Sequence, residues 1–186
     1  NLNKSVKILS KSNPLECWSQ LWNKPLYSNV RAGASHSDKW VKQFIKIGIN
    51  DELENFIDDN KFKVIKENNE FIFKGEISER ILKNTTAAKW RIFAIYAAAK
   101  MFNKRLKINK NFPFFDITSD IDQLENNITK LLSELKIDNQ ATYWGTITVS
   151  HFLTDFGSAI KPDIHVCRTL RKMNLFSTKK ILPEFD

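Results

Sequence analysis

Asp163 is the residue whose type and position most clearly suggest chemistry. It follows Pro162 in the stretch FGSAIKPDIHVCRTLRKMNL, residues 156–175, and this proline–aspartate pair predicts the start of a helix. The free N–H groups and the dipole at a helix start favour an ionised carboxylate. A fixed negative charge beside a developing cation stabilises a transition state. Asp163 therefore has two compatible roles, helix cap and catalytic carboxylate.

Three side chains close to Asp163 in the sequence could contact phosphate. Lys161 precedes it by two residues, and His165 and Arg168 stand on the first turns of the predicted helix. Each also has a structural interpretation, because Lys161 and Arg168 suit solvent-exposed positions and His165 suits a packed one. Both interpretations stay open for all three.

A helix predicted over 141–156 places Trp144, Thr148, His151 and Asp155 along one stripe. A base extruded from a duplex needs an aromatic platform and polar groups along its edge. Trp144 and His151 could form such a base pocket. A polar stripe packed against another helix explains the same spacing.

The charge of the chain favours a polyanionic partner. The net charge is +8 and the isoelectric point is about 9.4. Residues 100–111 carry five Lys/Arg and no acid, residues 161–180 carry six Lys/Arg against Asp163, and residues 51–59 carry five acids and no base. Solvated helix faces explain each basic run taken singly. The two runs together favour nucleic acid.

Residues 135–175 resemble the C-terminal half of the helix-hairpin-helix DNA glycosylases, a superfamily that includes the endonuclease III and 3-methyladenine glycosylase families. The expected order is helix, link, helix and Gly157 turn, followed by DIHVCR at 163–168, which is similar to the family's D-x-H-V-x-R. The resemblance implies that Asp163 stabilises the oxocarbenium-like sugar, or orients water, as a base leaves duplex DNA. It also implies a set of DNA contacts, namely Lys136, Asn139, Gln140, Lys161, His165 and Arg168.

The link between the two helices departs from the family pattern. Family members carry glycines in a hairpin that here reads KIDNQ, residues 136–140, where Asn139 could adopt a positive φ instead. Bifunctional members also carry a lysine nucleophile just after the hairpin, whereas residues 140–146 contain no lysine. We therefore expect a monofunctional glycosylase without lyase activity.

Several site classes have no pattern in this sequence. The two cysteines, Cys17 and Cys167, lie far apart without a CxxC, and the three histidines and the scattered acids form no close ligand pattern, so we expect no metal and no cofactor. The chain has no apolar run long enough to cross a bilayer and no signal-peptide pattern at its start. These features predict an intracellular protein that does not enter membranes.

The elements that must position these residues are mostly helices. We expect an all-α, two-lobed helix-hairpin-helix glycosylase-like fold in one domain, 1–186, with a small β-hairpin near 62–74 and the hairpin and catalytic region at about 124–175. A central buried helix is predicted from a cap at Thr85 or Thr86. Other predicted helices cover 12–22, 37–48, a segment from Thr118 or Ser119 to Leu135, and 141–156.

The sequence thus predicts a monomeric DNA glycosylase that binds duplex DNA, flips out a damaged or modified base and hydrolyses its N-glycosidic bond with Asp163. The alternative is a non-catalytic helix-hairpin-helix DNA-binding module. A third interpretation is a helical interaction domain with an acidic protein partner.

Overall fold

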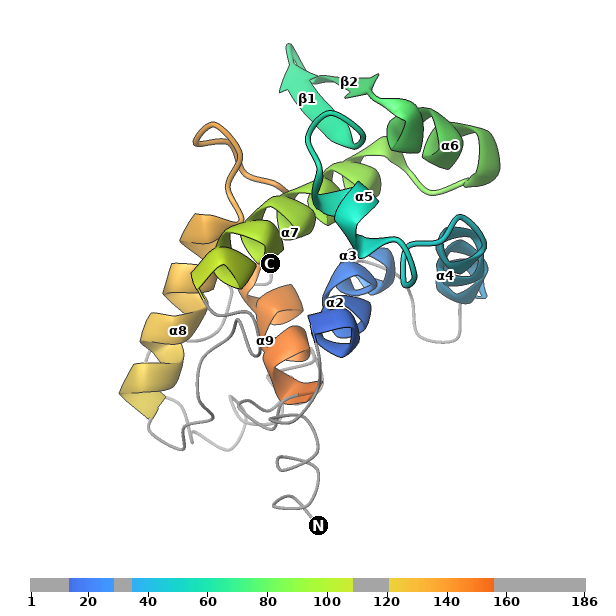
Figure 1. Cartoon of the computed structure of the whole chain (residues 1–186). Coiled ribbons are helices and arrows are strands. Elements are labelled where there is room, and N and C mark those ends of the chain that lie inside the picture. Colours follow the sequence, from blue (N-terminus) through green and yellow to red (C-terminus); the bar gives the residue numbers. More distant parts are fainter. Residues whose placement is uncertain (1–13, 29–34, 109–120, 156–186) are drawn as a thin grey trace.

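The computed structural model describes residues 14–28, 35–108 and 121–155. This part is mostly helical and contains one small antiparallel hairpin, which confirms the predicted helical class and the hairpin (Figure 1). The elements in chain order are α2 (Pro14–Trp22), α3 (Lys24–Tyr27), α4 (His36–Lys46), α5 (Leu53–Ile57), β1 (Lys63–Glu67), β2 (Glu70–Lys74), α6 (Glu76–Asn84), α7 (Lys89–Ile108), α8 (Ile121–Glu134) and α9 (Thr146–Asp155).

Helix α7 is the centre of the fold. Its segment 92–99 is buried on every side, as expected for a helix that is apolar and alanine-rich around its whole circumference. It contacts α2, α3, α5 and both strands. Figure 1 shows α7 crossing between α8 and α9 on one side and α4 and α6 on the other. The predicted central buried helix is therefore confirmed.

The start of α7 differs from the prediction. The helix begins at Lys89, because the preceding residues Glu76–Asn84 form α6 and Thr85 is the residue that ends it. Thr86 donates its backbone N–H to the side chain of Gln43 in α4 at 3.1 Å instead of opening a helix. A contact with a distant element thus overrides the local cap signal.

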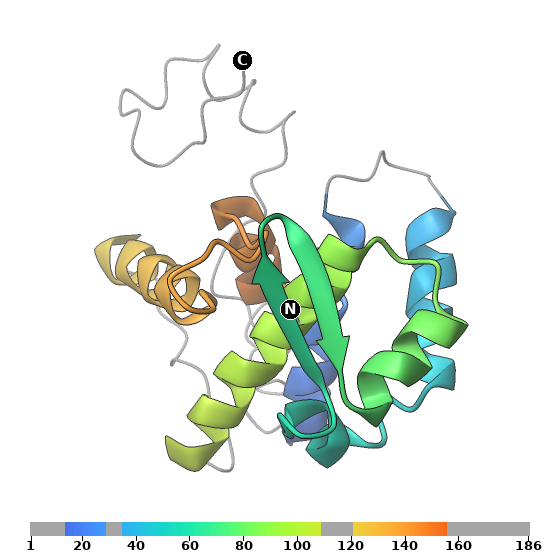
Figure 2. The ribbon, with the colours of Figure 1, turned by 90° about the horizontal axis from the view of Figure 1, so that it is seen from above.

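The hairpin β1–β2 turns through Asn68 and Asn69, whose φ angles are 49° and 64°. Asparagine tolerates this left-handed conformation, which the tightest hairpin turns require at both central positions. Residues Glu67 and Glu70 pair directly on either side of the turn. Val64 is buried and Phe71 packs on Phe93 of α7, with ring centroids 5.5 Å apart, so the hairpin lies on α7 (Figure 2).

Ion pairs between distant residues reduce the charge segregation of the sequence. Asp59, in the acidic segment, pairs with Lys100 of α7. Arg105 of α7 pairs with Glu134 of α8, with Nε and Oε2 2.7 Å apart and both side chains mostly buried. The described part of the basic run, residues 100–108, is therefore not an uninterrupted cationic face. None of the helices in the described ranges has the length and apolarity needed to cross a bilayer.

Candidate nucleic-acid interface

The link after α8 forms a tight turn that contains no glycine. The N–H of Gln140 donates to the carbonyl of Ile137 at 2.8 Å, and the N–H of Ile137 donates to the carbonyl of Gln140 at 3.3 Å. Asp138 and Asn139 occupy the central positions with φ angles of 49° and 61°. The predicted positive φ of Asn139 is confirmed. Asp and Asn are the non-glycine residues that best tolerate this conformation, so the turn does not need glycine.

The surface of this turn carries mixed charge. Lys136, Asp138, Asn139 and Gln140 are all exposed. Within the described ranges, no hydrogen bond uses the backbone N–H of Asp138 or Asn139. Two such N–H groups beside a lysine suit an oxyanion such as phosphate. The negative charge of the Asp138 carboxylate would repel the same ligand.

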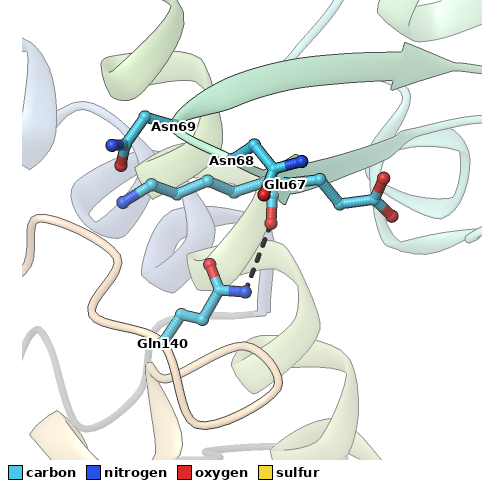
Figure 3. Close-up of a pocket in the computed structure, with 5 residues that line it drawn as sticks. Glu67, Asn68, Asn69 and Gln140 are labelled. Atoms are coloured by element: carbon cyan, nitrogen blue, oxygen red, sulfur yellow. Dashed lines mark hydrogen bonds between the residues drawn. The ribbon is translucent and has the colours of Figure 1, made fainter.

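A second turn lies against the first. The Gln140 side-chain Nε2 donates to the backbone carbonyl of Lys66 at 3.2 Å, and this bond joins residues 74 positions apart in the sequence (Figure 3). An open groove of about 550 Å³ lies between the turns. Its lining consists of Lys66, Glu67, Asn68, Asn69 and Gln140. Three of the five lining residues thus carry carboxamides, and the space is large enough for a small planar ligand.

Tyr143 provides an exposed ring close to this groove. It is 42% exposed, and its ring centroid lies 5.2 Å from the Lys66 ammonium and 5.3 Å from the Trp90 ring. Its φ angle is 65°, which is unusual for a bulky residue. The ring centroid of Phe71 lies 6.3 Å from that of Tyr143.

Trp90 is held in place by a buried cation. The Arg91 guanidinium lies 4.1 Å from the Trp90 ring and 4.7 Å from the Trp40 ring. It donates to the carbonyls of Leu26 at 3.2 Å and Ser28 at 2.7 Å, near the end of α3. Burial lowers the pKa of Arg91 from its usual value, and these carbonyls and rings stabilise the charged form. The arginine thus links α3, α4 and α7.

Trp144 does not share a stripe with His151 as predicted. Helix α9 begins at Thr146, not at Ala141, so Trp144 precedes the helix. Its indole is 9% exposed, and Nε1 donates to the carbonyl of Ala94 in α7 at 2.8 Å. Trp144 is therefore a core residue outside α9, whereas His151 is a half-buried residue of α9. Asp155, at the end of the same predicted stripe, pairs with buried Lys24.

The other predicted site residues divide into two groups. Lys136, Asn139 and Gln140 are brought together at the turn after α8. Asp163, Lys161, His165 and Arg168 lie outside the described residues. In the described ranges, no group of three or more His, Cys, Asp or Glu side chains could hold a metal ion.

Four residues at this site are not predicted from the sequence, namely Lys66, Asn68, Asn69 and Tyr143. The sequence Glu-Asn-Asn-Glu at 67–70 marks a turn, but nothing local shows that this turn meets Gln140. Tyr143 was predicted inside a helix, where its exposed position could not be anticipated. Comparison with protein-family models, with curated proteins and with solved structures finds no match to this chain.

Proposed function

We propose that this chain binds DNA and that the turn Lys136–Gln140 contacts a phosphate of the backbone. The observation that carries the proposal is the left-handed pair Asp138–Asn139 in a tight turn between α8 and α9. In the helix-hairpin-helix pattern that the sequence resembles, glycines supply this backbone geometry. Here Asp and Asn supply it; both residues are exposed beside Lys136, and within the described ranges neither backbone N–H makes a hydrogen bond.

The proposal extends to the two-lobed glycosylase-like fold and to base excision. Its support is the DIHVCR segment at 163–168, in which Asp163 would stabilise the sugar cation as the base leaves. Because Trp144 is packed in the core, an aromatic contact with an extruded base would come from another residue. An intracellular, monomeric protein that acts on duplex DNA without metal or cofactor belongs to the same proposal.

The phosphate contact can be tested with two opposite charge changes in the turn. Lys136→Gln should weaken binding to a labelled duplex and reduce the slope of log affinity against log salt by about one. Asp138→Asn should strengthen binding several-fold, because asparagine keeps the left-handed backbone while it removes a negative charge. Fluorescence anisotropy at about 50 mM and about 200 mM salt measures both effects.

The control for Lys136 is Lys83→Gln, because Lys83 is also an exposed lysine but stands on α6, away from the link (Figure 1). If Lys83→Gln and Lys136→Gln change affinity equally, the turn is not the contact. If Asp138→Asn leaves affinity unchanged, no phosphate lies near that carboxylate.

Base excision requires a separate assay. Duplexes that contain alkylated, oxidised, deaminated or unmodified bases are incubated with the full chain, and abasic sites are scored with and without alkali. Release of a base by the original protein and not by Asp163→Asn, with DNA binding retained, supports the glycosylase proposal. Binding without release from any duplex would leave the non-catalytic DNA-binding module as the function.

A further inference from the structure

The groove between the two turns combines a polar rim with an adjacent aromatic ring. Its lining includes Asn68, Asn69 and Gln140, which carry carboxamides, and Lys66, whose ammonium lies over the Tyr143 ring. We propose that this groove binds one unpaired nucleobase of single-stranded DNA. The Tyr143 ring would stack on the base and the carboxamides would hydrogen-bond its edge. The inference rests on the proposed function in that it takes DNA as the partner.

The backbone around Tyr143 is built to keep its ring outward. Thr142 is buried and donates its hydroxyl to the carbonyl of Leu135, and Trp144 is buried and bonded to Ala94. Thr142 and Trp144 are thus fixed in the core, and Tyr143 lies exposed between them with a φ angle of 65°. A bulky residue in this conformation costs folding free energy, and such residues concentrate at functional sites. The fold maintains the exposed ring despite that cost.

The chemistry of the lining fits a base better than a phosphate. A carboxamide presents a donor and an acceptor together, which is the pattern that Asn and Gln use to pair with the edge of a base. Glu67 also lines the groove, and its carboxylate would repel a phosphate but not an uncharged base. The Lys66 ammonium, on a flexible stem, can leave the ring and follow the phosphate next to the bound base. Charge complementarity therefore places the base in the groove and the backbone outside it.

The inference predicts a preference for bases over backbone. The probe is a labelled single strand of about 12 nucleotides of deoxyadenosine, compared with an abasic strand of the same length, which retains the phosphates but has no bases. The original chain should bind the base-bearing strand roughly tenfold more tightly than the abasic one. The variant Tyr143→Asn should lose this preference, because asparagine accepts the left-handed backbone and removes only the ring.

Two further variants separate stacking from folding. Tyr27 is exposed to a similar extent, 41% against 42% for Tyr143, and Tyr27→Asn should leave the preference intact. The double variant Asn68→Gly with Asn69→Gly keeps the positive φ angles of the turn and removes two carboxamides, so it should reduce the preference several-fold. Thermal melting of each variant confirms that it folds.

Equal binding of the two strands by the original chain would overturn the inference. A preference that persists in Tyr143→Asn would also overturn it, because the ring would then not be the stacking surface. If duplex affinity responds to Lys136→Gln and Asp138→Asn as expected but no base preference exists, the inference fails and the proposed function stands. If the chain binds neither single-stranded nor duplex DNA, both fail.

Discussion

Gly75 joins β2 to α6, and its replacement by alanine should destabilise the whole domain. Its backbone has φ 91° and ψ 158°, a conformation that is almost confined to glycine. A Cβ at this position would lie 2.3 Å from the carbonyl oxygen of Lys61 and 2.7 Å from that of Asn60. Both contacts are with backbone, so a side-chain rotation cannot relieve them.

The expected cost can be worked from these contacts. The backbone conformation alone costs roughly 1–3 kcal/mol for a residue other than glycine. The Lys61 carbonyl also accepts the N–H of Ile77 at 3.0 Å. Moving this carbonyl away from the new methyl group would weaken that bond, which adds about 1 kcal/mol. We expect a total loss of about 3 kcal/mol, which corresponds to a fall in melting temperature of roughly 6–12 °C for a chain of this size.

Urea unfolding followed by tryptophan fluorescence measures this loss, since the chain contains five tryptophans. Gly145→Ala is the matched control, because a Cβ at Gly145 would meet no atom within 4 Å. Gly48→Ala should fall between the two, since Gly48 has a φ of 85° but the three atoms nearest to its new methyl group all belong to the flexible Glu52 side chain. If Gly75→Ala and Gly145→Ala differ by less than about 1 kcal/mol, the inferred backbone clash does not exist.

Three other predictions concern the core. Trp144→Phe removes the hydrogen bond to Ala94 and should cost about 1–2 kcal/mol in urea unfolding, with unchanged DNA affinity; a selective loss of DNA binding would contradict the core assignment. Glu134→Leu removes the carboxylate that pairs with the mostly buried Arg105 and should cost about 2 kcal/mol in urea unfolding; a loss below about 0.5 kcal/mol would show that this ion pair contributes little to stability. Burial raises the pKa of the Tyr96 phenol above its usual value, and the nearby Asp59 carboxylate raises it further. The neutral phenol therefore contributes its full stabilisation at pH values below the unfolded tyrosine pKa of about 10. This stabilisation is lost as the pH rises from that value towards the higher pKa of the folded state. Between about pH 8 and about pH 10.5, the urea midpoint of Tyr96→Phe should fall less than that of the original chain. Equal falls in the two proteins would refute the raised pKa of Tyr96.

Some features could be predicted because short segments determine them. The alanine-rich pattern of α7 and the turn sequence of the β1–β2 hairpin depend on neighbouring residues and were predicted correctly. The positive φ of Asn139 follows from the tolerance of asparagine for that conformation and was also anticipated. Propensity and turn chemistry act over a few residues, which is the range that sequence patterns cover.

The tertiary structure decided where these segments meet. Packing against α7 holds Trp144 outside α9, although the apolar pattern favoured a helix from Ala141. Asp59 and Glu134 form ion pairs with Lys100 and Arg105, and no local sequence pattern predicts these pairs. They reduce the positive charge of the basic run over its described part, 100–108.

By itself, the sequence determined the helical class, the hairpin and the turn at 136–140. Tertiary packing alone brought that turn to Lys66 and exposed Tyr143 beside the resulting groove. The physical reason is that burying the apolar faces around α7 fixes the positions of both turns, and the energy of that burial exceeds the local preferences of the few residues that connect them.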